Sequence, residues 1–190
     1  MSIKTKQDPP PVRGFVSANA GGGGPVNLVL LGLREDPVRA LELKIPPPVL
    51  ALLFAVAMWC ISLVTSRFEI SAVLRNTAVF VIATVGFGFA VSGFLAFRRA
   101  RTTISPVKPE AASSLVTAGV YHFTRNPMYL GLSLVLLAWA LFLSSPWTFL
   151  GPVAFVLYIN RFQIAPEERV LSELFGSAFA DYQSKVRRWL

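Results

Sequence analysis

Two short segments of the chain carry the residue types best suited to chemistry. Arg125 lies just before Pro127, a residue favoured at the first position of a helix, and the free N–H groups of a helix N-terminus attract anions. The Arg125 guanidinium could hold a carboxylate with two parallel hydrogen bonds. Glu167 and Glu168 follow Pro166 at the expected start of a later helix. If the two segments meet, a cation faces a pair of acids.

Aromatic side chains accompany both segments, at Tyr121, Phe123, Tyr129 and Phe162. With a cation at one wall, acids at the other and rings between them, such a site would suit a zwitterionic ligand with a flat ring. A different interpretation is that Arg125 only marks the cytoplasmic boundary of a membrane helix, and that the two glutamates cap a helix N-terminus. The residues alone leave both interpretations open.

Long apolar runs must position these segments. Ile45–Ser66 and Asn76–Phe97 are each 22 residues without a charge, enough for one crossing of ~30 Å of hydrocarbon. The third run, Asn126–Asn160, has 35 residues, too many for one crossing. The Ser-Ser-Pro inside it is typical of a turn, so we divide this run into two helices, Met128–Leu143 and Trp147–Ile164. As a hairpin, these two helices would bring the arginine and the glutamates to the same side.

The composition fits a membrane protein. Apolar residues make up 54% of the chain and charged residues 15%, with a mean hydropathy of +0.57. Ordinary soluble domains are about 45–50% apolar and about 25% charged, so a disordered chain is excluded and a soluble protein with buried apolar helices is disfavoured. Cys60 is the only cysteine, which rules out an intrachain disulfide framework.

Basic residues fall almost entirely on one side of the expected helices. Of the 18 Lys and Arg residues, 2 lie between the first and second runs, and 16 lie before the first, between the second and third, or after Asn160. The positive-inside rule then places both termini and the long second loop of a multi-pass membrane protein in the cytoplasm. This topology accounts for the net charge of +8 without nucleic-acid binding. The sequence has no cluster with metal-ligand spacing.

The patterns predict an all-α integral membrane protein preceded by a tail. Residues 1–44 hold six Gly and five Pro, and we expect a flexible cytoplasmic tail with a short surface helix at Pro37–Lys44. Residues 45–190 form the membrane domain, with about four transmembrane helices. Small residues on its second helix allow close helix packing or, alternatively, a groove for a flat ligand. These are Ala83, Gly86, Gly88, Ala90, Ser92 and Gly93.

The last segment, residues 165–190, has apolar residues at helical spacing with charged residues on the other face. We expect an amphipathic helix on the cytoplasmic side, kinked at Gly176. Its terminal Arg187–Trp189 suits a surface that carries anionic lipid.

Two motifs resemble those of isoprenylcysteine carboxyl methyltransferases and phospholipid methyltransferases, a family of integral membrane enzymes. They are GVYHFTRNPMYLG at residues 119–131 and PEERVLSELFGSAFADYQSKVRRWL at residues 166–190. The family pattern is roughly Gly-x-Tyr-x-x-x-Arg-His-Pro-x-Tyr-x-Gly, followed by a Glu-Glu pair, a Phe-Gly and a later Tyr. The resemblance covers residues 45–190. The matching residues are Gly119, Tyr121, Arg125, Asn126, Pro127, Tyr129, Gly131, Glu167, Glu168, Phe175, Gly176 and Tyr182.

The resemblance implies S-adenosylmethionine as the cofactor, bound in the cytoplasmic half of a helical membrane domain. It also implies a hydrophobic or lipid-modified acceptor that arrives from the bilayer, methylated on a carboxylate, amine, thiol or phenol. The residues implied in catalysis are Arg125, Glu167 and Glu168. The residues implied in cofactor binding are Val116, Thr117, Gly119, Tyr121, Arg125, Asn126, Pro127, Tyr129, Glu167, Glu168 and Leu171.

One departure from the family pattern restricts the mechanism. Asn126 stands where the family has His, and an amide can donate a hydrogen bond but cannot take a proton at neutral pH. Asn126 is therefore not a general base. Two other classes stay open: an NADPH-dependent membrane reductase of the sterol reductase kind, and a small non-catalytic membrane protein.

Overall fold

The structure is a computed structural model that describes residues 42–100 and 114–190. Every regular element in these two ranges is helical. The expected tail and most of the surface helix at Pro37–Lys44 lie outside the described residues. Of that helix only residues 42–44 are described, and they form a turn rather than a helix.

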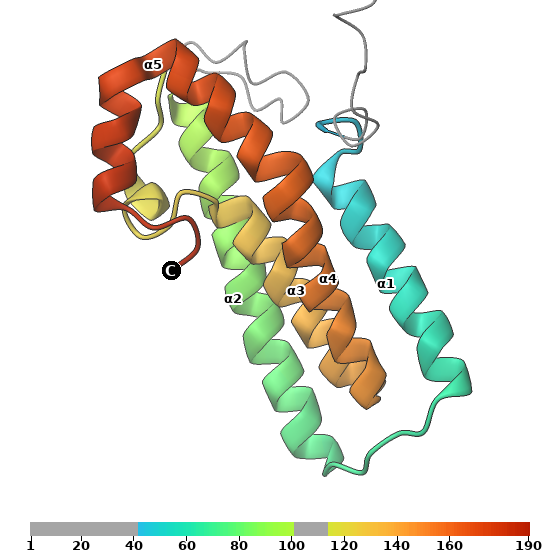
Figure 1. Cartoon of the computed structure of the whole chain (residues 1–190). Helices are drawn as coiled ribbons and strands as arrows, with labels where there is room; N and C mark the ends of the chain where they lie inside the picture. Colours follow the sequence, from blue (N-terminus) through green and yellow to red (C-terminus); the bar gives the residue numbers. More distant parts are fainter. Residues whose placement is uncertain (1–41, 101–113) are drawn as a thin grey trace, which may run out of the picture. The chain divides into compact units, whose positions relative to one another are not determined.

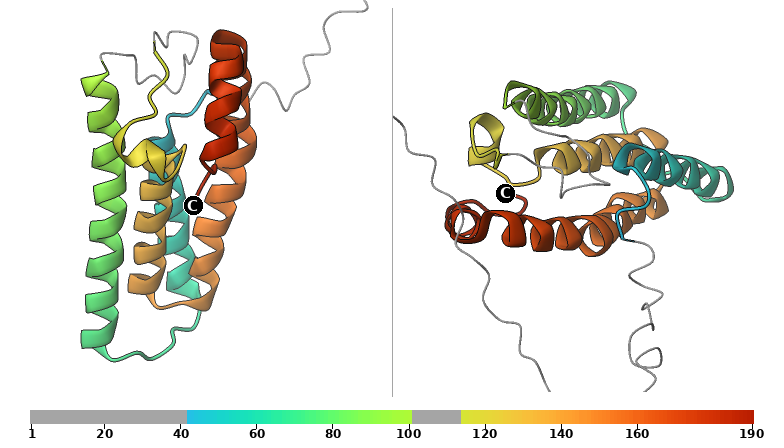
Figure 2. Two further views of the ribbon diagram at one scale, coloured as in Figure 1. Left: turned by 90° about the vertical axis from the view of Figure 1, so that its left-hand side faces the viewer. Right: turned by 90° about the horizontal axis from the view of Figure 1, so that it is seen from above.

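Four helices run alternately up and down the bundle (Figure 1). They are α1 (Pro47–Val64), α2 (Ala72–Arg99), α3 (Pro127–Leu143) and α4 (Leu150–Ile159). Both views of Figure 2 place α3 between α2 and the α4–α5 rod. The expected positions of the apolar runs and of the final hairpin are thus close to the observed ones, and α2 extends beyond its charge-free run at both ends.

Two helices, α1 and α2, are long and apolar enough to cross a membrane, and α3 is a shorter apolar helix of 17 residues. Within the hydropathic windows of α1 and α2, only 28% and 11% of residues are buried. Large apolar side chains are exposed on both helices, for example Val64 on α1 and Phe80 on α2. Helices of a soluble core would bury such side chains, so these surfaces are suited to contact with lipid.

Small residues bring α2 and α3 into close contact. A Cβ atom on Gly131 would lie 2.5 Å from the Gly86 carbonyl oxygen and 2.8 Å from the Ala90 nitrogen. A Cβ on Gly93 would lie 2.8 Å from the Met128 side chain. No larger residue fits at Gly131, because the backbones of α2 and α3 almost touch there, and at Gly93 the side chains at the start of α3 fill the space. The packing role predicted for small residues of the second helix is therefore confirmed at Gly86 and Gly93.

The hairpin turn between α3 and α4 is closed by local hydrogen bonds. Ser144 ends α3 in the left-handed conformation, and the short turn η4 (Pro146–Phe149) follows. The buried Thr148 hydroxyl donates to the carbonyl oxygens of Ala140, at 3.2 Å, and Ser145, at 2.7 Å. These bonds add to the backbone bonds that the same two carbonyls accept from Ser144 and Thr148, and they tie the turn to the last part of α3.

The expected break between the fourth helix and the amphipathic helix at Ile164 is wrong. α4 passes through one π-helical turn, η5 (Asn160–Ile164), directly into α5 (Ala165–Lys185). Pro166 lacks the N–H that would bond the Phe162 carbonyl, and the Leu43 N–H donates to that carbonyl instead, at 3.1 Å. The helix can continue because the widened turn admits the proline and another segment satisfies the free acceptor.

The expected kink at Gly176 is confirmed. Its φ of 49° and ψ of −122° lie outside helical values and are open to a residue without a Cβ. Beyond it the second half of α5 turns back toward the bundle, and the chain ends beside the start of α3 (Figure 1). Phe179, Tyr182 and Val186 form a small apolar cluster that holds this returning segment, with Leu171 packed against it.

Candidate functional site

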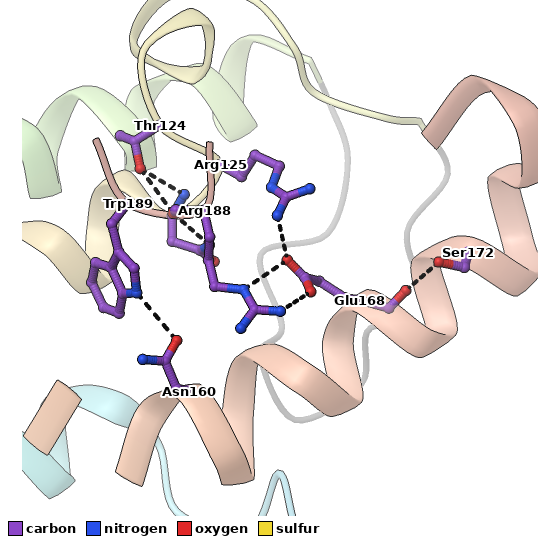
Figure 3. Close-up of polar contacts among 8 residues, drawn as sticks. Thr124, Arg125, Asn160, Glu168, Ser172, Arg188 and Trp189 are labelled. Carbon is purple, nitrogen blue, oxygen red and sulfur yellow. Dashed lines mark hydrogen bonds and ion pairs between the residues drawn. The ribbon is translucent and has the colours of Figure 1, made fainter. Parts of the chain in front are cut away.

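The corner before α3 is bonded to the end of the chain. We call residues 186–190 the C-terminal tail. The Arg125 N–H donates to the Arg187 carbonyl at 3.0 Å, and the Asn126 side-chain amide donates to the Arg188 carbonyl at 3.0 Å. The buried Thr124 hydroxyl donates to the same Arg188 carbonyl at 3.2 Å (Figure 3). These three hydrogen bonds fix the tail against the corner.

Glu168 is held by two guanidinium groups. Arg125 Nη2 lies 3.1 Å from Glu168 Oε1. Arg188 donates from Nε to Oε1 at 3.2 Å and from Nη2 to Oε2 at 2.5 Å, as a two-pronged fork. Figure 3 shows the two arginines reaching the carboxylate from different segments, the corner before α3 and the C-terminal tail. The predicted meeting of Arg125 with the glutamate pair is therefore observed.

Glu167, the adjacent residue, has a different environment. Its Oε1 accepts hydrogen bonds from the Tyr129 hydroxyl at 2.5 Å and from the Gln163 amide at 2.9 Å. Burial raises the pKa of Glu167 from 4.5 to about 7, against the lowering effect of these two hydrogen bonds. This carboxyl group is therefore harder to ionise than an ordinary glutamate.

Two tyrosines close the site on the side of the turn η3 (Gly119–His122). The Tyr182 hydroxyl donates to the Tyr121 carbonyl at 2.7 Å, which links the second half of α5 to η3. Burial raises the pKa of Tyr121 well above its ordinary value and that of Tyr182 to about 12. Both hydroxyls are consequently neutral at physiological pH and available as hydrogen-bond donors.

Comparison with known proteins decides the family. A family model described as phospholipid methyltransferase matches residues 74–178, more than half of the chain. The chain belongs to this family. The match includes the corner before α3 and both glutamates, and it ends before the C-terminal tail.

The chain is also similar to three individual proteins. An uncharacterized protein of Haemophilus influenzae is 52% identical over 63 residues, which are 33% of this chain and all of that protein. Protein-S-isoprenylcysteine O-methyltransferase B of Arabidopsis thaliana is 27% identical over 131 residues, 67% of this chain and 57% of that enzyme. Protein-S-isoprenylcysteine O-methyltransferase of Saccharomyces cerevisiae is 34% identical over 86 residues, 44% of this chain and 35% of that enzyme. No solved structure gives a significant match.

The chain therefore spans little more than half of the length of the plant enzyme and about a third of the yeast enzyme. The resemblance to the phospholipid and isoprenylcysteine methyltransferases is confirmed.

The structure gathers most of the residues that the family motif implied. Arg125 and Glu168 touch, Tyr129 and Glu167 touch, and buried Tyr121 is close enough to Glu167 for that charge to raise its pKa. Of the other implied residues, Gly119 starts η3 at a φ of 66°, Asn126 and Pro127 start α3, Val116 and Thr117 are half-buried, and Leu171 packs on α5.

Two of the expected rings lie elsewhere. Phe123 is 71% exposed and lines a groove of about 560 Å³ beside α2. Phe162 packs against Tyr158, with ring centroids 4.6 Å apart, and lies under Arg161. The helix-cap interpretation of the glutamates is also wrong, because α5 continues from η5 and their carboxylates bind side chains instead.

Sequence reasoning missed Gln163 and Arg188. Gln163 lies four residues before Glu167, so helical spacing could have placed both on one face. Arg188 was assigned with its neighbours to an anionic lipid surface, yet it turns inward to Glu168, and Trp189 donates to Asn160 at 3.1 Å. Arg187 keeps an exposed side chain. No local pattern distinguishes the two adjacent arginines.

Proposed function

We propose that the protein is an S-adenosylmethionine-dependent methyltransferase that methylates a hydrophobic or membrane-borne acceptor, in the manner of protein-S-isoprenylcysteine O-methyltransferases. The observation that carries this proposal is the meeting of the two family motifs. Arg125 and Tyr129, from the first motif, contact Glu168 and Glu167, from the second, at one end of the helices.

The residues present fit a ligand that has both an anionic and a cationic group. Arg125 Nε is buried and has no hydrogen-bond partner among the described residues, so this guanidinium still has an N–H to donate to an anion. Glu168 is already paired with two arginines, which leaves Glu167 as the acidic group available to the cofactor's amino group or ribose hydroxyls. We assign Arg125 to binding the cofactor carboxylate and Glu167 to binding its amino group or ribose hydroxyls.

The chemistry asks little of the protein beyond alignment. The sulfonium of S-adenosylmethionine carries an already activated methyl group. Tyr121 and Tyr129 are buried and, with the backbone of residues 116–119, would orient the cofactor and exclude water. For a neutral amine acceptor, Glu167 is the side chain at the site with a pKa near 7, and it can take the proton that is released.

We place the protein in a bacterial inner membrane with both termini in the cytoplasm. The charge distribution supports this topology, since 16 of the 18 Lys and Arg residues lie on one side. The short α3 and the α4–η5 segment would complete four crossings as a hairpin, with the site at their cytoplasmic ends.

The groove beside α2 is suited to the hydrocarbon chain of the acceptor. It opens on a lipid-exposed helix and shares the η3 turn with Tyr121, and Arg99 at one end can pair with an anionic group. Its lining residues are Val85, Gly88, Phe89, Ser92, Leu95, Ala96, Arg99, Gly119, Val120 and Phe123.

Filling the groove tests this assignment. A Cβ at Gly88 meets nothing within 4 Å, so Gly88→Leu should fold normally while occupying the groove. We expect KM for a lipid acceptor to rise about tenfold, with the cofactor Kd unchanged. Val81→Leu, on an exposed part of α2 outside the groove, is the matched control. Unchanged KM in Gly88→Leu would remove the groove from the proposal.

Cofactor binding tests the function itself. Purified protein in lipid nanodiscs is titrated with S-adenosylmethionine and, separately, with NADPH. We expect binding of the first only, weakened about tenfold or more in Arg125→Ala and less in Glu167→Gln, with Arg169→Ala as the control for loss of a surface charge. Binding of NADPH alone, or of neither ligand, would contradict the methyltransferase proposal. Labelled cofactor and a membrane extract would then identify the methylated product.

A further inference from the structure

The C-terminal tail is built into the site, although it lies outside the residues that match the family model. Val186 leaves α5 in an extended conformation, and the tail then accepts hydrogen bonds from Thr124, Arg125 and Asn126 on its carbonyls. Trp189 adds a bond to Asn160. The tail is thus fixed at both its backbone and its side chains, with Arg188 directed at Glu168 (Figure 3).

The tail changes the charge of the site. Arg125, Glu168 and Arg188 together carry a net charge of +1, and the three side chains are only 13%, 16% and 38% exposed. Bringing two guanidiniums out of water against one carboxylate is unfavourable unless a further anion completes the group. Glu167 does not complete it, since its bonded oxygen is directed at Tyr129 and Gln163.

Hydrogen-bond capacity leads to the same conclusion. Each guanidinium has five N–H donors, whereas one carboxylate offers about four acceptor positions. Glu168 therefore cannot satisfy both arginines, and the buried Arg125 Nε has no partner among the described residues. The donors that remain, the buried Arg125 Nε among them, are therefore placed to bind a second acceptor, and a compact anion suits two adjacent guanidiniums.

We infer that Arg188, carried in by the C-terminal tail, forms with Arg125 a two-arginine clamp for the carboxylate of the methyl donor, and that Glu168 holds the two guanidiniums at the correct separation. This inference rests on the proposed function. It assigns the donor's amino-acid end to the arginines and gives a binding role to a residue beyond the matched region of the family.

Two ligands that differ only in the carboxylate test the clamp. S-adenosylmethionine and its decarboxylated analogue are titrated by calorimetry into wild-type protein, Arg188→Gln and Arg188→Lys in nanodiscs. We expect Arg188→Gln to weaken S-adenosylmethionine binding about tenfold or more and to change binding of the analogue by less than about twofold. Arg188→Lys, which keeps the charge without the fork, should fall between wild type and Arg188→Gln.

Arg187→Gln is the matched control, because its side chain is exposed and lies on the same tail. It should leave both affinities unchanged. Equal weakening of both ligands in Arg188→Gln would mean that the arginine only supports the fold, and unchanged affinity for both would remove it from the site; either result overturns the inference. If wild-type protein binds the analogue but not S-adenosylmethionine, the clamp is also wrong. If it binds neither, the proposed function itself fails.

Discussion

Two regions on either side of the first turn of α5 use the same residue type in opposite ways. In the arginine region, Glu168 is an ion-pair partner between two guanidiniums. In the tyrosine region, the half-buried Glu167 accepts hydrogen bonds from the Tyr129 hydroxyl and the Gln163 amide. One residue along the helix thus separates a carboxylate bound to two guanidiniums from a carboxyl group whose pKa is raised to about 7. The difference comes from the surroundings, since the side chains are identical.

The largest expected effect concerns the pH dependence of stability. The pKa of Glu167 is about 7 in the folded protein and 4.5 ordinarily, so the folded state binds the proton more tightly. The contribution of Glu167 to the free energy of unfolding should therefore be greatest below about pH 4.5. It should fall by up to about 3 kcal/mol as the pH rises to about 7, and then stay constant. Thermal unfolding between pH 5 and pH 8 measures this fall.

Glu167→Gln should remove most of this pH dependence, because an amide does not ionise. Glu173→Gln, on the exposed surface of α5, should keep it. A wild-type protein as stable at pH 8 as at pH 5 would show that Glu167 is not buried as described.

The next effect concerns the arginine region. Glu168→Gln leaves two guanidiniums close together without their shared anion, and should lower the free energy of unfolding by about 2 kcal/mol at pH 7, a value reduced for the partial exposure of Arg188. Denaturant unfolding measures the loss. Added salt should lessen it, because the repulsion is screened. Full stability in Glu168→Gln would mean that the tail is held by its backbone bonds alone.

The smallest effect links a single hydroxyl to the tyrosine region. Tyr129→Phe removes a donor that favours the ionised form of Glu167, so the pKa of Glu167 should rise further. We expect a loss of about 1 kcal/mol at pH 8 and a smaller one at pH 5. Tyr158→Phe, whose ring packs on Phe162, is the control and should lack this pH dependence. A greater loss of stability at pH 5 than at pH 8 would contradict this prediction, because it would mean that the Tyr129 hydroxyl stabilises the protonated form of Glu167.

Much of the architecture could be predicted because apolar length and a turn signal leave few choices. Once the run after Arg125 is folded into a hairpin, the start of α3 and the end of α4 must share one side, and the meeting of Arg125 with the glutamates follows. The binding and catalytic roles of these residues stay predictions. The close approach at Gly86 and Gly93 was predictable for a similar reason, since small residues on one helix face favour contact.

The remaining features depend on tertiary structure. Pro166 indicated a helix start, but the N–H of Leu43, more than a hundred residues earlier, removes the cost of an unbonded carbonyl, and the helix continues. The different surroundings of Glu167 and Glu168 depend on the rotation of α5 about its axis. The inward turn of Arg188 depends on the direction in which the chain leaves the kink.

Gly176 therefore determines where Arg188 lies. Arg188 follows Gly176 by twelve positions. The chain reverses direction at this glycine, and the reversal brings Arg188 back to Glu168, which lies in the first turn of the same helix. A straight α5 would leave Arg125 and Glu168 as a neutral couple. The residue that possesses no side chain thus determines, by its backbone torsion alone, whether this arginine–glutamate group is neutral or carries a net charge of +1.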